Sequence, residues 1–478
     1  MKRYTEVAAS YGRRHFDLLG AALILAIALA LRLIDLGSVS SNLTADELND
    51  LQNAYRVIYG QAGGFFGLDW NQSPNLNMYL KAASIQVFGD SIAGTRMYSV
   101  VLSMAALVAF YPLARRRLDP LPALASLFLL ATSLWFLHFS RTPWVAMSSV
   151  LAAVMAAYLL DLALEKQKLW LFALLGAAVA FGAYGYFGGR TLVFVVAACY
   201  FIACWLQPKD VWSLTKGFAL AGVVAFVLFA PQLKTLLEDW EYANTRPRAV
   251  SVLNVEGEYL GDSNRGEIIL HQTLRAARGF LLLDKSVTEY GLWARHRPAD
   301  WAFIDQATGL LYWAGLTAGV FYWRKYLYWW AFLLIPLFFT QVFSVGTPDG
   351  SRGLMAAPLM FLFVGLGIQT LLSLVPKPTS TPGQTGKRAN GQTPYLTAGR
   401  WLPGVVVVLA LAIGAFNADR YFDWMKEPGA LAARQPAIAG SEFHHFRTLA
   451  REMSREGQLV SEEAWLRYRR MVLGPEAQ

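Results

Sequence analysis

Residues 18–34 read LLGAALILAIALALRLI, an apolar run that contains a single charged residue, Arg32. A run of this length is sufficient for a helix to cross the hydrocarbon core of a bilayer. The stretch Thr44-Ala45-Asp46-Glu47 follows shortly afterwards and contains two adjacent carboxylates. Ionisable side chains close to a bilayer are costly and commonly mark a functional site. The sequence therefore predicts a membrane-spanning helix followed by an active-site loop at the membrane surface.

The composition of the chain identifies its broad class. Of its 478 residues, 55% are hydrophobic and only 16% are charged, which is typical of a polytopic membrane protein. The formal net charge of +9 would suit nucleic-acid binding, but the basic residues lie in short loops between apolar segments. This is the positive-inside pattern, so we expect membrane lipids and no nucleic acid as partners. Cys199 and Cys204 share one apolar segment and predict neither a disulfide nor a metal site.

Further apolar segments of spanning length lie near residues 92–113, 120–138, 144–164, 168–187, 190–206, 217–235, 304–322, 327–344, 353–374 and 401–417. The sequence therefore predicts an all-α polytopic protein with about eleven transmembrane helices. The first run resembles a signal peptide because basic residues precede it. However, it ends in Arg32 and Asp35 and not in a small-residue cleavage site, so we expect a retained span.

We expect the N-terminus in the cytoplasm, and an odd number of spans then places the C-terminus outside. The loop charges favour the same orientation, since Arg115-Arg116-Arg117 and most lysines fall in the predicted inner loops. The chain then divides into a transmembrane module, 1–417, with outer loops near 37–91 and 236–303 and a flexible inner linker near 376–399, and an extracytoplasmic tail, 418–478.

Two parts of the predicted outer surface have helical periodicity. In the first outer loop, apolar residues recur at helical spacing over 46–59 and 77–88, which predicts two short helices lying along the membrane surface. In the tail, one face of a predicted amphipathic helix is formed by Phe443, Phe446, Leu449 and Met453.

Four arginines mark the outer ends of separate predicted spans: Arg96, Arg141, Arg190 and Arg352. Guanidinium groups from several helices at one depth would surround an anion, and their planar geometry suits phosphate oxygens. A lipid-linked phosphate fits this arrangement, because its tail can lie between the helices. The alternative is that each arginine extends to the lipid headgroups, as arginines at helix ends commonly do.

The other candidate residues have equally simple alternatives. Asp46 and Glu47 would also suit the first turn of a surface helix, where the helix dipole favours acids. Tyr184 and Tyr186, beside Gly188-Gly189-Arg190, are candidates for binding a sugar, but packing is the alternative. The chain has no Walker loop, dinucleotide fingerprint or His-Glu-x-x-His run. We expect no cofactor and no metal cluster, although one divalent ion at the acidic pair stays an alternative.

A series of short motifs follows in a fixed order: Ala45-Asp46-Glu47, Pro74 to Leu80, Phe88 to Ser91, Gly94 to Ser99, Phe139-Ser140-Arg141, Tyr186 to Arg190, and Pro348 to Pro358. Their order resembles the GT-C superfamily of membrane glycosyltransferases. Within it, the chain resembles the bacterial family 39 type, kin of protein O-mannosyltransferases and of the aminoarabinose transferases that modify lipid A. The likeness is clearer in the N-terminal part of the chain than in the rest.

The resemblance implies an inverting glycosyltransferase of the bacterial plasma membrane. It would transfer a hexose or pentose from a polyprenyl-phosphate donor to an acceptor on the extracytoplasmic side. Asp46 would be the general base or would orient the acceptor, and Glu47 would support it. Arg141 and Arg190 would neutralise the departing lipid phosphate, with Arg96 and Arg352 as further members of that site. Neighbouring helical residues point about 100° apart, so the two acids should have different roles.

Two departures from the family leave the acceptor open among lipids, glycans and proteins. The tail is shorter than the periplasmic domain of many relatives, and the second outer loop matches no motif. A transporter or flippase for lipid-linked sugars is the alternative from another class. The chain has no internal repeat, and its polar residues gather at one surface and not at the bilayer midplane, which disfavours a transporter. A non-catalytic assembly subunit is a third hypothesis.

Overall fold

The structure is a computed structural model that describes residues 2–39, 43–254, 264–287, 297–298, 301–375, 395–427, 436–438 and 442–473. The helices of the bundle are α1 (Lys2–Leu33), α4 (Ile92–Arg115), α5 (Pro120–Thr132), α6 (Leu134–Arg141), α7 (Ala146–Lys166), α8 (Leu169–Gly185), α9 (Leu192–Leu206), α10 (Val211–Glu238), α13 (Gln306–Phe321), α14 (Trp323–Leu337), α16 (Ala357–Ser373) and α17 (Tyr395–Trp424). The remaining elements are β1 (Leu43–Thr44), α2 (Ala45–Ile58), α3 (Leu76–Phe88), η1 (Phe187–Thr191), α11 (Trp240–Val250), α12 (Arg265–Ala276), η4 (Phe338–Val342), α15 (Gly350–Gly353), β2 (Pro436–Ile438), α19 (Phe443–Arg455) and α20 (Glu462–Leu473).

The predicted all-α membrane fold is confirmed, and every predicted span contains a helix. Among the described helices, six are long and apolar enough to cross a membrane. A seventh span would be formed by α5 and α6, which meet at a bend of 55°. The remaining predicted spans include α8, α13 and α14, which have 17, 16 and 15 residues. Apolar runs in the sequence thus predict membrane helices correctly, but they do not show where a helix ends.

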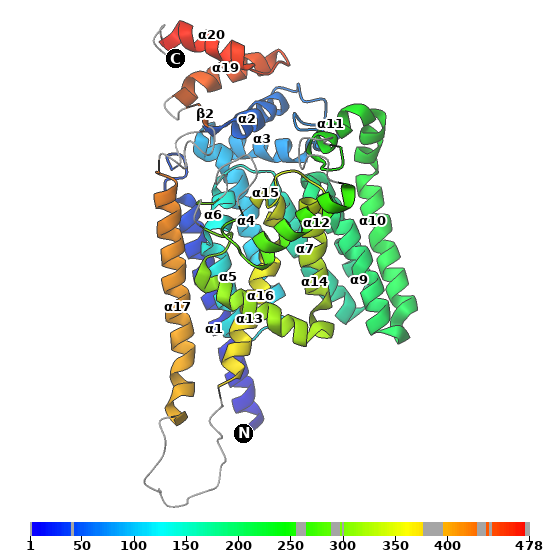
Figure 1. The fold of residues 1–478 in the computed structure, drawn as a ribbon, viewed down its shortest axis with the longest axis vertical. Helices are drawn as coiled ribbons and strands as arrows, with labels where there is room; N and C mark the ends of the chain where they lie inside the picture. The colour runs from blue at the N-terminus through cyan, green and yellow to red at the C-terminus, as the bar shows by residue number, and fades with distance from the viewer. Residues whose placement is uncertain are drawn as a thin grey trace, which may run out of the picture.

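The bundle has buried central helices and peripheral helices that face outward (Figure 1). The apolar 18-residue stretch of the span that contains α16 is 83% buried. The corresponding stretch of the span that contains α10 is only 17% buried. The exposed apolar side chains of α10 and α17 are what a helix facing lipid requires. Small residues permit the closest helix contacts, as in many membrane bundles. A Cβ atom on Gly315 of α13 would lie 1.7 Å from the carbonyl oxygen of Phe363 in α16.

A second, smaller core lies over one end of the bundle. The two predicted surface helices are present as α2 and α3, and they lie across the top of the bundle in Figure 1. The amphipathic tail helix is also present as α19, and it buries Phe443, Phe446 and Ala450 against α2. Strand β1, directly before α2, pairs with β2 of the tail. The tail therefore packs on the helix that carries Asp46.

The start of α1 and the end of α20 lie at opposite ends of the molecule (Figure 1). This separation agrees with an odd number of membrane crossings. Most of the predicted inner linker, 376–394, and the middle of the second outer loop lie outside the described residues. Helix α17 begins at Tyr395, so the linker ends before residue 399.

Candidate active site

The N-terminus of α2 is fixed by a capping box. The Thr44 hydroxyl accepts a hydrogen bond from the backbone N–H of Glu47 at 3.3 Å, and the Glu47 carboxylate accepts one from the N–H of Thr44 at 2.9 Å. This reciprocal pattern satisfies two N–H groups that the first turn of a helix leaves unpaired. It also turns the Glu47 side chain inward, where it is almost fully buried.

Glu47 also forms a buried ion pair with Arg96 of α4. The Arg96 Nη2 atom lies 3.2 Å from the Glu47 carboxylate, and its Nη1 atom donates to the carbonyl oxygen of Leu36 at 2.9 Å. The pair therefore connects α2 to α4 and to the chain that follows α1. These contacts favour a positioning role for Glu47 and Arg96.

Asp46 is half-buried and has different surroundings from Glu47. Its charge acts on Asp50, which lies one helical turn further along α2. Asp50 is buried, forms an ion pair with Lys81 of α3, and accepts a hydrogen bond from the Trp70 indole at 2.9 Å. Burial raises the pKa of Asp50, whereas the Lys81 ammonium acts in the opposite direction. Asp46 thus belongs to a cluster of charged residues.

A chain of polar contacts links this cluster to the end of α8. The Lys81 ammonium lies 5.1 Å from the centre of the Tyr98 ring. The Tyr98 hydroxyl donates to the Asn77 side-chain oxygen at 2.7 Å, and the Asn77 amide donates to the carbonyl oxygen of Gly185. Buried polar groups are stable only when they are paired in this way. The chain fixes α2 relative to α8 and to η1, which follows it.

Asp69 adds a third carboxylate, from the loop between α2 and α3. It is buried and accepts backbone hydrogen bonds from Asn71 at 2.8 Å and Ser73 at 2.9 Å. Burial, together with the nearby charge of Asp50, raises the pKa of Asp69 to about 7. Asp69 also interacts electrostatically with Arg190. The loop therefore connects the acid cluster to η1.

Arg190 lies in η1 at one end of a large apolar cavity. Its guanidinium lies 4.8 Å from the centre of the Phe187 ring, and its Nε and Nη2 atoms are buried without a hydrogen-bond partner in the described part of the chain. A buried charged donor without a partner is costly. Such a group indicates a site for an anionic ligand.

The cavity, which we call the donor groove, has a volume of about 640 Å³ and is walled by α8, α9 and α10. Arg190 is the only charged residue among the described residues that line it. Val193 and Phe226 line the groove and are also exposed, so the groove opens sideways toward the surroundings of the bundle. Its chemistry suits a long apolar group that ends in an anion.

Arg141 has a different environment, at the end of α1. Its Nη1 atom donates to the carbonyl oxygens of Leu31 at 2.7 Å and Arg32 at 3.0 Å, and its guanidinium lies 4.9 Å from the Phe422 ring centre. Basic side chains commonly pair with the last carbonyls of a helix in this way. Arg141 therefore connects α6 to α1 and to α17.

We expect Arg141→Ala to lower the free energy of unfolding by about 1–3 kcal/mol, because buried carbonyl oxygens of α1 would lose their donor. The melting temperature in detergent measures this change. The control is Arg278→Ala, which removes an exposed ion pair to Asp284 and should have almost no effect. Equal melting temperatures for wild type and Arg141→Ala would contradict the structural role.

The remaining candidates are Tyr184 at the end of α8, Tyr186 between α8 and η1, and Arg352 in α15. Tyr184 is buried, and its hydroxyl donates to the carbonyl oxygen of Leu228 at 2.9 Å. Tyr186 and Arg352 line a second cavity of about 310 Å³. The four candidate arginines therefore have four different surroundings, and Arg190 and Arg352 line separate cavities.

No group of three or more His, Cys, Asp or Glu residues in the described ranges is arranged to hold a metal ion.

Comparison with solved structures identifies the fold of the chain. The chain is similar in structure to the oligosaccharyltransferase of Archaeoglobus fulgidus in its apo form, with a TM-score of 0.52 and 14% sequence identity. This match covers 90% of the present chain and 61% of the other. The chain has the GT-C fold. The fold that the order of the motifs implied is therefore confirmed.

Three further matches concern one protein family and two structures of one enzyme. Residues 72–234 match the model of a family described as dolichyl-phosphate-mannose-protein mannosyltransferase. ArnT from Cupriavidus metallidurans is similar in the apo state, with a TM-score of 0.49, 13% identity, and coverage of 94% of this GT-C chain and 78% of ArnT. With undecaprenyl phosphate bound, ArnT gives a TM-score of 0.47 and 15% identity, with coverage of 91% and 77%. No curated protein sequence matches the chain.

Proposed function

We propose that this GT-C protein transfers a sugar from a polyprenyl-phosphate donor to an acceptor at the outer surface of the membrane. The donor groove is the observation that carries the proposal. It combines an apolar wall with one guanidinium, two of whose nitrogen atoms are buried without a hydrogen-bond partner in the described structure. A polyprenyl phosphate has the matching parts, because its tail is apolar and its head is an anion that arginine binds well. The family that matches residues 72–234 is named for a donor of this kind.

In the proposed mechanism, the donor phosphate pairs with Arg190 and its tail occupies the groove. An acceptor hydroxyl beside Asp46 attacks the anomeric carbon and transfers its proton to the Asp46 carboxylate. The bond from this carbon to the phosphate oxygen breaks, and its electron pair leaves with the lipid phosphate. Arg190 stabilises the charge that develops on that phosphate. Attack from the side opposite to the leaving group inverts the anomeric carbon.

The half-buried position of Asp46 supports its role, since an acceptor can approach it from the outer surface. Glu47 and Arg96 would act indirectly by holding α2 in position. A network of charges links Asp46 to Arg190 through three residues that were not among the sequence candidates. These are Asp50, Lys81 and Asp69. They would maintain the spacing of the base and the phosphate site.

The proposed orientation places the acid cluster and the tail outside the cell and the N-terminus inside. We expect a cysteine at exposed Arg467 to react with an impermeant maleimide on intact cells, and a cysteine at exposed Lys168 to react only after permeabilisation. Cys199 and Cys204 are first replaced by alanine to remove background labelling. Labelling of positions 168 and 467 from the same side would contradict the orientation.

The experiment that tests the function uses purified protein in nanodiscs with a panel of polyprenyl-phosphate sugars that carry a radiolabel in the sugar. An extract of the envelope supplies acceptors. The proposal expects label in a new product and release of unlabelled polyprenyl phosphate. A transporter would move the labelled lipid between leaflets in sealed vesicles without forming a product, and that result would refute the proposal.

A further inference from the structure

The second cavity, of about 310 Å³, is separate from the donor groove. Helix η1 contributes Arg190 to the groove, whereas Phe187, Gly188 and Thr191 of the same helix line the second cavity. The two sets of lining residues have no member in common. The second cavity also receives Arg246 from the second outer loop, the part of the chain that matched no family motif. It therefore requires its own explanation.

The charged residues that line the second cavity are basic. Arg246 and Arg352 line it, and its described lining contains no acidic residue. Arg352 also forms an ion pair with Asp349, whose carboxylate lies 3.8 Å from its Nε atom. The side chain of Arg246 has no hydrogen bond or ion pair with any residue that the structure describes. Tyr186, which lies between η1 and α8, is close enough to both arginines to interact with their charges. An anion is the ligand that these groups would bind most favourably.

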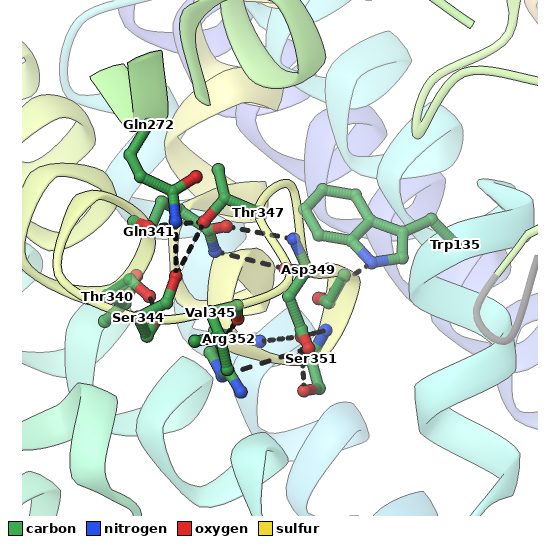
Figure 2. Close-up of polar contacts among 11 residues, drawn as sticks. Trp135, Gln272, Thr340, Gln341, Ser344, Val345, Thr347, Asp349, Ser351 and Arg352 are labelled. Atoms are coloured by element: carbon green, nitrogen blue, oxygen red, sulfur yellow. Dashed lines mark hydrogen bonds and ion pairs between the residues drawn. The ribbon is translucent and has the colours of Figure 1, made fainter. Parts of the chain in front are cut away.

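The wall that carries Arg352 is held by a network of hydrogen bonds (Figure 2). The Gln341 side chain donates to the carbonyl oxygen of Asp349 at 3.1 Å and accepts from the Asp349 N–H at 2.9 Å. The Asp349 carboxylate accepts from the N–H groups of Ser351 and Arg352, and Arg352 donates to the carbonyl oxygen of Val345. The guanidinium is thus positioned before a ligand binds, which reduces the entropic cost of binding.

The surroundings of the cavity indicate a lipid headgroup. Helix α11, which carries Arg246, exposes Trp240 and Tyr242, and such aromatic residues are enriched at membrane interfaces. On another side, Phe339 lines the cavity and stacks on Phe194, with ring centroids 4.6 Å apart. Both phenylalanines are exposed on the outside of the bundle. The cavity thus has cationic groups near exposed aromatic residues of the kind found at membrane interfaces, and an apolar edge.

We propose that the second cavity binds the phosphoryl headgroup of a second membrane lipid while the donor occupies the groove. Arg246 and Arg352 bind the phosphate, and the acyl chains leave past Phe339. Asn71 lines the same cavity and follows Trp70, whose indole donates to Asp50, so the bound headgroup lies beside the acid cluster. This inference goes beyond sugar transfer, and its test requires no catalysis.

The test measures binding of dioctanoyl phosphatidic acid to the full chain in detergent by microscale thermophoresis, with dioctanoyl phosphatidylcholine and inorganic phosphate as comparison probes. We expect Arg246→Gln to weaken phosphatidic acid binding about tenfold, the loss typical of a charge-assisted hydrogen bond. The matched control is Arg248→Gln on the same helix, because both arginines are exposed but Arg248 pairs with Glu241 at 3.1 Å and does not line the cavity. Its affinity should equal that of wild type.

Three results would overturn the proposal. Unchanged phosphatidic acid binding in Arg246→Gln would exclude the second cavity as its site. Equally tight binding of inorganic phosphate would remove the lipid from the proposal. An equal loss of affinity for the polyprenyl-phosphate donor in Arg246→Gln would assign the cavity to the donor itself. If phosphatidic acid binds as expected and no sugar transfer is found, the proposed function fails and this inference stands.

Discussion

Replacing Asp46 by asparagine is expected to lower the rate of sugar transfer at saturating donor by about 10²-fold or more, because the base that takes the acceptor proton is lost. Asparagine has the same shape as aspartate, so folding and donor affinity should change little. The measurement is turnover with a radiolabelled donor, together with the donor Kd and the melting temperature of the same preparation. Turnover should fall while the other two quantities stay close to wild type.

Glu47→Gln is the matched control for Asp46→Asn, since the two acids are adjacent and only one is assigned to the chemistry. Glutamine preserves the length of the side chain but leaves Arg96 buried without its carboxylate. Breaking a buried ion pair in this way costs about 3–5 kcal/mol, so the main effect should be a lower melting temperature. Turnover of the folded fraction should fall less than in Asp46→Asn. The reverse order of effects would exchange the roles of the two acids.

Arg190→Ala is expected to weaken donor binding at least about 30-fold, because a lipid phosphate in the groove would lose its charged partner. The stability of the protein without donor should not fall, since the buried guanidinium has two nitrogen atoms without a hydrogen-bond partner in the described structure. This combination is opposite to the one expected for Arg141→Ala. The donor Kd and the melting temperature together distinguish a ligand-binding arginine from a structural one.

Arg190→Lys provides the finer comparison. Lysine restores the positive charge but not the planar group that binds two phosphate oxygens at once, so we expect only partial recovery of donor affinity. An unchanged donor Kd in Arg190→Ala would show that the groove does not bind the phosphate. A lower melting temperature without a change in Kd would instead assign Arg190 to the packing of η1.

The elements that could be predicted from the sequence are those with local signals. The periodicity of 46–59 and 77–88 corresponds to α2 and α3 within one or two residues. The spacing of Thr44 and Glu47 is itself the signature of a capping box, which indicates that Glu47 faces its own helix terminus. Asp50, one turn after Asp46, was a further local signal for the acid cluster.

The surroundings of the arginines could not be predicted because their partners are distant in the sequence. Arg141 pairs with carbonyl oxygens more than a hundred positions away, and Lys81 pairs with Asp50 across 31 positions. An arginine at a helix end has the same local sequence whether it caps another helix, pairs with an acid or faces a ligand. Only the packing of α1, α4 and η1 distinguishes Arg141, Arg96 and Arg190.

The central claim is that Asp46 acts in sugar transfer from a donor held by Arg190. The most direct measurement is a single-turnover experiment in nanodiscs, with an envelope extract as the source of acceptors. It follows release of polyprenyl phosphate from a labelled polyprenyl-phosphate sugar. Wild type, Asp46→Asn and Arg190→Ala are compared at one donor concentration above the wild-type Kd. The account predicts rapid release by wild type, slow release by Asp46→Asn with full donor occupancy, and slow release by Arg190→Ala with low occupancy. Release by Asp46→Asn at the wild-type rate would contradict the account.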